Sequence, residues 1–318
     1  MLYHHITELI GNTPLLQIDP AVHQLADVEL YAKLELFNPF GSLKDRTAWG
    51  MLKDDIERVV QHQQTIVEFS SGNTAKALAL LASVFGVDCI TITNRIKVPE
   101  VQGILTLVGA TIDTLPGNTE CPDYAYLEQK IRAHPEQYYH TDQYRNAKNY
   151  LAHYAQTGRE IYEDIGPVDY FYGGLGTAGS TRGVSAYLKE KNPAFQNIGV
   201  VAELGNSLPG LRNIDEMAEM GIFEQSHYQE FVVVDIQEAL TGMFTLIKRC
   251  GVLAGLSSGA VYQAIIRHLK NQQQRPLKVV FIVCDRVEWY LSYIQKHRPE
   301  VFETQTPAQT AVSHPSLV

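Results

Sequence analysis

The chain has 318 residues, 45% hydrophobic and 19% charged, which is enough for two globular domains. Its 35 acidic residues outnumber 26 basic ones, and the net charge of -9 disfavours binding to nucleic acid or to an anionic membrane. The N-terminus lacks the pattern of a secretory signal, and no apolar run is long enough to span a bilayer. Four widely spaced cysteines predict reduced thiols rather than disulfides or a metal site. We therefore expect a cytoplasmic protein.

Segments typical of strands and of helices alternate along the chain. In chain order we expect a strand at 28–35, a helix at 42–60, a strand at 65–69, a helix at 74–85, a strand at 89–93, a helix at 98–108 and a strand at 111–115. Strands at 169–172, 198–203, 230–234 and 278–283 and helices at 180–191 and 258–272 follow. This alternation predicts parallel sheets covered by helices, an α/β fold. Residues 304–318 are polar and aperiodic, which predicts a flexible tail.

The stretch GSLKDR (41–46) places a lysine at the start of a predicted helix. Ser42 and Asp45 are spaced as in a capping box, so Lys44 would lie in the first turn. The positive end of the helix dipole disfavours an ammonium there, and a lysine with a lowered pKa can attack an aldehyde. A solvated lysine on a helix surface has the same local pattern.

The stretch SSGNT (70–74) joins a predicted strand to a predicted helix. Free backbone N–H groups and small hydroxyl side chains at such a turn bind a carboxylate or a phosphate. A capped turn without a ligand would look the same in sequence.

The stretch GLGTAGS (174–180) is a second glycine-rich turn before a helix, and it predicts a phosphate site. Gly174, Gly176 and Gly179 also match the G-x-G-x-x-G dinucleotide pattern, and Glu203 falls where a ribose-binding acid would lie. A nucleotide-binding oxidoreductase is therefore the alternative from a different class. No Lys-Ser/Thr pair follows the glycines, which disfavours nucleotide phosphoryl transfer.

With these loops, the chain resembles the cysteine synthase and cystathionine β-synthase family of pyridoxal 5′-phosphate (PLP) enzymes. The resemblance rests on IGNTPLLQI (10–18), AKLELFNPFGSLKDR (32–46), SSGNTAKALAL, GLGTAGSTRGV and AGLSSGA (254–260), in the family's order. It implies two domains with open, twisted, mostly parallel sheets, the tryptophan synthase β-like PLP fold, and an active site between them. It also implies a small mobile domain at 38–145, a large PLP-phosphate-binding domain at 1–37 and 146–303, and a homodimer.

The resemblance implies a role for each matching residue. Lys44 corresponds to the catalytic lysine that forms a Schiff base with PLP, Asn73 to the asparagine that binds the ring hydroxyl, and Ser257 to the serine facing the pyridine nitrogen. The phosphate would lie in a cradle formed by Gly176, Thr177, Ala178, Gly179 and Ser180. The substrate carboxylate would contact Ser70, Ser71, Gly72, Asn73, Thr74 and Gln143.

The activity implied is a PLP-dependent β-replacement on an activated L-serine, either O-acetylserine or O-phosphoserine, through an aminoacrylate. Lys44 would act as general base on Cα, while PLP supplies the electronic chemistry. A neutral serine opposite the pyridine nitrogen favours β-elimination over transamination. The leaving group, the nucleophile and the pathway stay open.

Two segments depart from the family pattern. In AELGNSLPGLRN (202–213) the usual Gly-Ile-Gly is replaced by Gly210, Leu211 and Arg212, and further on Cys284-Asp285 replaces the usual Pro-Asp and is followed by Arg286. These segments resemble an amine-using branch that joins O-phosphoserine to glutamate in making 2,3-diaminopropionate. Arg212 and Arg286 are candidate anion binders, although surface or helix-capping arginines would fit equally.

Several alternatives within the family also stay open. They are formation of a 2,3-diaminopropionate precursor, cystathionine- or lanthionine-type synthesis, and β-elimination that releases hydrogen sulfide. A non-catalytic family member that binds a partner protein is a further possibility, but the presence of Lys44, Asn73 and Ser257 together argues against it.

Overall fold

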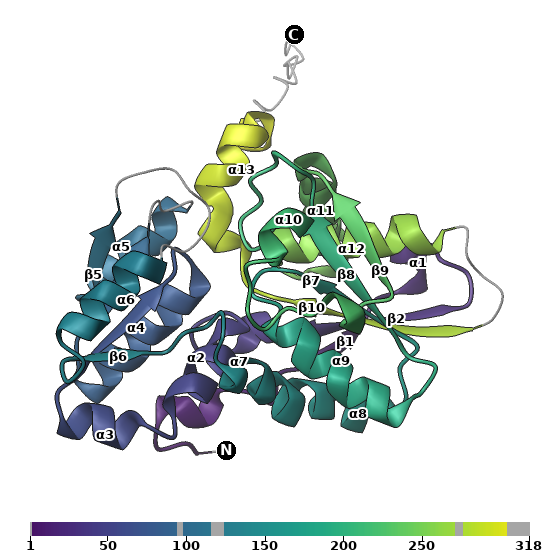
Figure 1. The fold of residues 1–318 in the computed structure, drawn as a ribbon. Helices are drawn as coiled ribbons and strands as arrows, with labels where there is room; N and C mark the ends of the chain where they lie inside the picture. Colours follow the sequence, from purple (N-terminus) through teal and green to yellow (C-terminus); the bar gives the residue numbers. More distant parts are fainter. Residues whose placement is uncertain (1, 94–97, 116–123, 271–275, 304–318) are drawn as a thin grey trace, which may run out of the picture.

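The computed structural model describes residues 2–93, 98–115, 124–270 and 276–303, and it contains two sheets (Figure 1). The strands are β1 (Leu15–Gln17), β2 (Val28–Leu34), β3 (Thr65–Phe69), β4 (Cys89–Thr93), β5 (Thr111–Thr114), β6 (Tyr138–His140), β7 (Tyr170–Gly174), β8 (Gln196–Ala202), β9 (Glu230–Val234) and β10 (Leu277–Val283). The larger sheet has the order β1-β2-β10-β7-β8-β9, and the smaller has the order β5-β4-β3-β6. All neighbouring strands are parallel except β1, which pairs antiparallel with β2. The expected α/β fold with two domains is confirmed.

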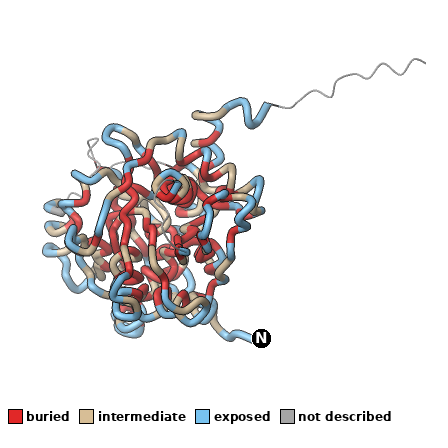
Figure 2. The backbone as a smooth tube through the Cα atoms, turned by 90° about the vertical axis from the view of Figure 1, so that its right-hand side faces the viewer, coloured by how far each residue is buried: buried red, intermediate tan, exposed pale blue. Residues whose placement is uncertain are grey.

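Helices surround both sheets. They are α1 (Pro20–His23), α2 (Lys44–Leu52), α3 (Ile56–Gln61), α4 (Asn73–Phe85), α5 (Pro99–Leu107), α6 (Tyr124–Ala133), α7 (Ala147–Ala152), α8 (Arg159–Ile165), α9 (Gly179–Lys191), α10 (Ile214–Met217), α11 (Ile236–Cys250), α12 (Leu256–Leu269) and α13 (Leu291–His297). A π-helical segment, His153–Gly158, links α7 to α8. Figure 2 shows the buried residues concentrated in the interior of the molecule, with the exposed segments around them.

The larger sheet is covered on both faces, which explains why its strands are apolar along most of their length. On one face, β2, β8 and β10 pack against residues of α11 and α12, such as Leu246 and Ile265. On the other face, β7 and β10 pack against residues of α8 and α9, such as Ile161 and Leu188. The sheet is therefore the middle layer of a helix–sheet–helix sandwich.

The smaller sheet shares its cores with the larger part of the molecule. One core joins residues of α2, α4 and α5 to Leu240 and Met243 of α11. Another joins Val67 of β3 and Ile92 of β4 to Leu175 and Val201. These shared cores hold the two sheets side by side, as Figure 1 shows.

The predicted helix at 42–60 is wrong as a single element. The structure ends α2 at Leu52 and begins α3 at Ile56. The hydroxyl of Tyr139 lies within hydrogen-bond distance of the Met51 carbonyl, at 3.1 Å, and of Asp55 Oδ2, at 2.9 Å. In a continuous helix the Met51 carbonyl would accept the backbone N–H of Asp55 instead. The chain turns there toward the edge of the smaller sheet.

Within the described ranges, no helix combines the length and apolar character needed to cross a bilayer. The predicted flexible tail at 304–318 lies outside the described residues.

Candidate active site

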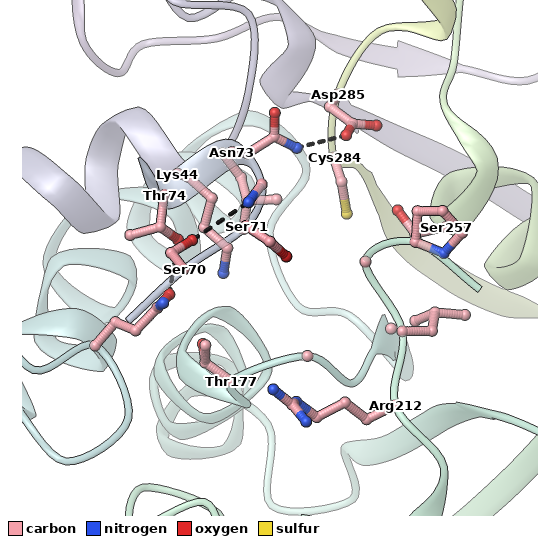
Figure 3. Close-up of a pocket in the computed structure, with 18 of the residues that line it drawn as sticks. Lys44, Ser70, Ser71, Asn73, Thr74, Thr177, Arg212, Ser257, Cys284 and Asp285 are labelled. Carbon is pink, nitrogen blue, oxygen red and sulfur yellow. Dashed lines mark hydrogen bonds between the residues drawn. The ribbon is translucent and has the colours of Figure 1, made fainter. Parts of the chain in front are cut away.

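A pocket lies between the two sheets, where the carboxyl ends of their parallel strands face each other. Ligands bind at this edge in open α/β sheets because the loops that follow the strands converge there. The pocket is lined by the start of α2, the β3–α4 loop, the segment after β6, the β7–α9 loop, residues 209–212, the start of α12 and the segment after β10. Figure 3 shows these side chains directed toward a common space.

Nearly every predicted site residue lines this pocket. They are Lys44, Ser70, Ser71, Gly72, Asn73, Thr74, Gln143, Gly176, Thr177, Ala178, Ser180, Arg212 and Ser257. Gly179 and Arg286 do not line it.

Lys44 is the first residue of α2, and its side chain enters the pocket. Burial lowers the pKa of its amine, and the nearby Cys284 and Asp285 oppose that shift only in part. A lowered pKa increases the fraction of unprotonated, nucleophilic amine near neutral pH. The solvated-lysine interpretation of the sequence is therefore wrong.

The expected capping box at Ser42 and Asp45 takes a different form. The Ser42 hydroxyl donates to Asp45 Oδ1 at 3.1 Å and accepts the backbone N–H of Lys44 at 3.2 Å. Asp45 Oδ2 accepts the N–H of Phe40 at 2.6 Å, so its carboxylate does not return to the backbone of Ser42. The side-chain network still fixes the start of α2, and with it Lys44.

Asn73, the first residue of α4, is held by a carboxylate from the opposite wall. Its Nδ2 donates to Asp285 Oδ2 at 2.6 Å, the contact drawn in Figure 3. Asp285 also accepts from the hydroxyl of Tyr290. Burial raises the pKa of Asp285, while the hydrogen bonds from Tyr290 and Asn73 and the charges of Lys76 and Lys44 oppose this shift. The contact fixes which end of the Asn73 amide faces Asp285.

The SSGNT loop is organised by hydrogen bonds to its side chains. Ser70 Oγ accepts the backbone N–H groups of Gly72 at 3.4 Å and Ala75 at 3.2 Å. The Thr74 hydroxyl donates to Gln143 Oε1 at 2.7 Å, and Gln143 Nε2 donates to the carbonyl of Phe69 at 2.8 Å. Two segments far apart in sequence, 70–74 and 141–146, are thereby locked together beside the first turn of α4.

The GLGTAGS loop presents backbone N–H groups at the start of α9. Among the described residues, the N–H groups of Gly176, Thr177 and Ala178 donate to no protein acceptor. Ala178 has a positive φ of 67°, an uncommon conformation for a residue with a Cβ, and it turns the chain into the helix. A Cβ on Gly176 would lie 3.1 Å from the carbonyl of Gly210, so glycine permits the two loops to approach closely. This arrangement suits a phosphate.

Gly179 has a packing role instead. A Cβ at this position would lie 2.0 Å from Asn149 Oδ1. Asn149 Nδ2 donates to the carbonyl of Gln143 at 2.7 Å and to the hydroxyl of Thr177 at 3.3 Å. The absence of a side chain at Gly179 thus gives Asn149 room to connect the two loops.

Ser257 lies in the first turn of α12, beside Cys284 at the end of β10. Burial raises the pKa of the Cys284 thiol to about 12, so this side chain lines the pocket as an uncharged thiol. Both residues line the pocket, Ser257 from the first turn of α12 and Cys284 from the segment after β10 (Figure 3).

The two candidate anion-binding arginines differ in position. Arg212 lines the pocket, with its guanidinium carbon 5.6 Å from the ring centre of Tyr144 and Nη2 3.4 Å from the Tyr144 hydroxyl. Arg286 is directed to Glu288, and its Nε donates to Oε1 at 3.0 Å. Glu203, the candidate ribose-binding acid, is exposed, accepts from Asn206 at 2.7 Å and does not line the pocket. The pocket therefore contains Arg212 but neither Arg286 nor Glu203.

Several lining residues had no role in the sequence interpretation: Tyr144, Cys284, Asp285, Trp289 and Tyr290. Cys284 and Asp285 directly follow an apolar β-rich run, so their position at the carboxyl end of a strand was the available signal. Tyr144 and Trp289 carry no such signal because aromatic side chains are frequent throughout cores.

Comparison with known proteins places the chain in a family. A family model described as pyridoxal-phosphate dependent enzyme matches residues 6–285. The chain belongs to this family. Its reaction class is PLP-dependent β-replacement of the cysteine synthase type, and amino-acid substrates fit this family.

Three individual proteins of this kind are similar to the chain over most of its length. Cysteine synthase from Aquifex aeolicus is 32% identical over 297 residues, which cover 90% of each chain. N-(2-amino-2-carboxyethyl)-L-glutamate synthase from Cupriavidus metallidurans is 31% identical over 309 residues, covering 92% of this chain and 90% of that protein. The crystal structure of O-acetyl serine sulfhydrylase isoform 3 from Entamoeba histolytica has a TM-score of 0.81 at 28% identity and covers 92% of this chain and 91% of its own.

The residues of the pocket fit PLP chemically. An amine with a lowered pKa is available for the aldehyde. At the start of α9, N–H groups that have no acceptor in the described part of the chain are available for the phosphate. The cysteine synthase-type enzyme described here therefore has a suitable donor set for its cofactor in one pocket.

Proposed function

We propose that this PLP-dependent enzyme replaces the β-substituent of an activated L-serine, O-acetylserine or O-phosphoserine, in the pocket between its sheets. The observation that supports this most directly is the position of Lys44. Its amine, with a pKa lowered by burial, shares one pocket with the N-termini of α4 and α9. A nucleophilic amine and two separate anion-binding turns are what an amino-acid substrate and a phosphorylated cofactor require.

Lys44 would hold PLP covalently through its ε-amine. The backbone of the segment 176–180 would bind the phosphate, the Ser257 hydroxyl would face the pyridine nitrogen, and Asn73 Nδ2 would reach the ring hydroxyl. When bound, PLP supplies an electron sink that makes the Cα proton of an attached amino acid acidic. A neutral serine partner leaves the ring nitrogen without a carboxylate that would keep it protonated.

The carboxylate of the substrate would bind at the SSGNT loop. The first-turn N–H groups of α4 and the hydroxyls of Ser71 and Thr74 surround one side of the pocket, and Gln143 supports Thr74. The positive end of the α4 dipole adds a favourable interaction with an anion. This anchor would place the substrate Cα near Lys44.

The amino group of the substrate would take the place of Lys44 on the cofactor, and the freed Lys44 would then move the proton. Its unprotonated amine takes the proton from Cα, and the resulting ammonium returns a proton to Cα when the product forms. We propose that the small domain, residues 38–145, closes over the site during these steps and excludes water.

Arg212 supports O-phosphoserine as the donor. A guanidinium in the pocket can pair with the charged phosphate of bound O-phosphoserine, whereas the acetyl ester of bound O-acetylserine is uncharged. The same cation would also suit an anionic second substrate. For this reason the amine-using reaction, with glutamate as nucleophile, is the second candidate, and it is consistent with the likeness to N-(2-amino-2-carboxyethyl)-L-glutamate synthase.

A product assay by mass spectrometry tests the proposal. Purified protein with PLP is incubated with O-acetylserine or O-phosphoserine, each combined with sulfide, cysteine, homocysteine, ammonia or glutamate. We expect one donor and nucleophile pair to give the β-substituted product well above the others. Absence of any product with both donors would contradict the proposed function.

We also propose that the chain forms a homodimer, as the family resemblance implies. Light scattering should then give twice the chain mass of 35.6 kDa. A monomer mass with full activity would contradict this proposal.

A further inference from the structure

Lys76 is a buried cation directly behind the wall of the pocket. It lies on α4, three residues after Asn73, and is 1% exposed. Its Nζ lies 3.7 Å from the ring centre of Trp289 and has no hydrogen-bond partner among the described residues. Because a buried ammonium without hydrogen bonds is costly, the charges and the aromatic ring around it must offset that cost.

The charges that shift the pKa of Lys76 belong to two other segments. Asp285, and after it Asp45 of α2 and Glu288, raise its pKa, and Arg286 lowers it; burial has the largest effect, so the pKa falls to about 8. Burial in turn raises the pKa of Asp285 and raises that of Asp45 to about 7. Each buried charge therefore depends on the others to remain ionised.

Asp285 connects this cluster to the pocket. Its Oδ2 accepts Asn73 Nδ2 at 2.6 Å, and its Oδ1 has no hydrogen-bond partner among the described residues. A carboxylate can only accept, so it selects the NH₂ end of the amide. The second N–H of that group then remains available for the pocket.

We propose that Lys76 is a positioning residue: its buried ammonium, over the ring of Trp289, is the countercharge of the Asp285 carboxylate that holds the NH₂ end of Asn73 toward the cofactor. This inference rests on the proposed function, because it assumes that Asn73 meets the ring hydroxyl of PLP. Without the ammonium, only the hydrogen bonds from Tyr290 and Asn73 and the charge of Lys44 oppose the effect of burial, so Asp285 is protonated more easily. A protonated Asp285 can donate to Asn73 Oδ1, so the amide can turn over and the donor to the ring hydroxyl is lost.

The test compares two cofactors on the apoprotein. Lys76→Met keeps the length and apolar stem of the side chain but removes its charge. Fluorescence titration measures the affinity for PLP and for 3-deoxypyridoxal 5′-phosphate, which lacks the ring hydroxyl. We expect K76M to bind PLP about tenfold more weakly, the effect of about one hydrogen bond, and to bind the deoxy analogue as the natural protein does.

Lys33→Met is the matched control. Lys33 is also 1% exposed, but its Nζ donates to the carbonyl of Thr13 and pairs with Glu160, and it does not line the pocket. K33M should leave the ratio of the two affinities unchanged, even where it lowers the melting temperature. An equal loss of affinity for both cofactors in K76M would indicate general damage to the site and would overturn the inference.

A double variant tests the route through Asp285. If Lys76 acts only through Asp285, D285N and K76M/D285N bind PLP equally well, because the amide at position 285 no longer needs a countercharge. This comparison holds even where K76M alone does not fold, since the double variant removes both charges. If K76M/D285N binds PLP more weakly than D285N does, Lys76 does not act through Asp285 alone, and the inference is overturned. Absence of PLP binding by the natural apoprotein would instead overturn the proposed function.

Discussion

The guanidinium of Arg46 in α2 donates two hydrogen bonds, of 2.6 and 2.7 Å, to the carboxylate of Glu160 in α8. It also donates two, of 2.7 and 2.9 Å, to Glu35, and Lys33 Nζ lies 2.9 Å from Glu160. Two cations and two carboxylates thus form a buried network in which the charges balance. Arg46 follows Lys44 by two residues, so this network ties the helix that carries the reactive amine to the larger sheet.

Replacing Arg46 by Met should destabilise the protein strongly. The substitution leaves Glu35 buried without its partner, and breaking a buried pair in this way costs about 3–5 kcal/mol. Chemical denaturation measures the free energy of unfolding. Arg58→Met is the control, because Arg58 is half exposed and pairs with Asp55 at 3.3 Å; we expect its effect to stay within about 1 kcal/mol. Equal stability of the two variants would contradict the assigned role of the network.

The same network predicts a loss of stability in acid. Burial opposes ionisation of Glu160, but the hydrogen bonds and charge of Arg46 and Lys33 outweigh it and lower the pKa to about 2. A carboxyl whose pKa is lower in the folded than in the unfolded state stabilises the fold above its unfolded pKa of about 4.3, and this contribution is lost as the pH falls toward 2. Glu160→Gln should therefore be less stable than the natural protein at pH 7, with the difference shrinking below about pH 4. A difference that is independent of pH would refute the assignment.

Lys44→Ala should abolish the visible absorption band of bound PLP and reduce turnover by at least about 10²–10⁴-fold, since general base catalysis alone contributes that much. Absorption spectra and initial rates measure the two effects. Lys53→Ala provides a control at the other end of α2, where the side chain is exposed. If K44A kept the band, some other side chain would be the site of attachment.

Arg212→Ala should discriminate between the two serine donors. We expect KM for O-phosphoserine to rise by roughly tenfold or more and KM for O-acetylserine to change little, because the guanidinium interacts with phosphate as a charged group. Arg286→Ala, which removes an arginine paired with Glu288 outside the pocket, should affect neither donor. Unchanged KM values for both donors in the Arg212 variant would remove the argument for phosphate.

Some elements could be predicted from the sequence because local pattern alone decides them. Strands β3, β4 and β9 have the bounds predicted, since each is a short run rich in β-branched and apolar residues. Helix α11 was not predicted, although Asp235 and Glu238 form a capping box at its start. The helical segment from 147 to 165 was also not predicted. It buries polar side chains such as Asn149, His153 and Thr157, so its sequence lacks the apolar stripe by which a helix is recognised.

The site was predictable to the extent that it consists of loops between strands and helices. The lysine, the two anion-binding turns, Gln143 and Ser257 meet in one pocket, as the resemblance implied. Lys76 could not be predicted as buried, since a lysine in a helix is ordinarily exposed. Its environment is set by Trp289 and Asp285, which are more than 200 residues away in the chain, as the separation of 212 residues between Asn73 and Asp285 shows. The domain boundaries and the individual roles in catalysis remain predictions.

Strand β10 lies between β2 and β7 in the larger sheet, although among the described residues it is the last strand in the chain. At translation rates of about 5–20 residues per second, the interval between the appearance of Leu34 and Leu277 is on the order of ten seconds or more. During that time β2, and also β7 once it has been synthesised, has an unpaired edge that can attract other chains. The nascent chain therefore exposes these strand edges until β10 has left the ribosome, and we expect truncation before Leu277 to yield insoluble aggregates rather than a smaller folded protein.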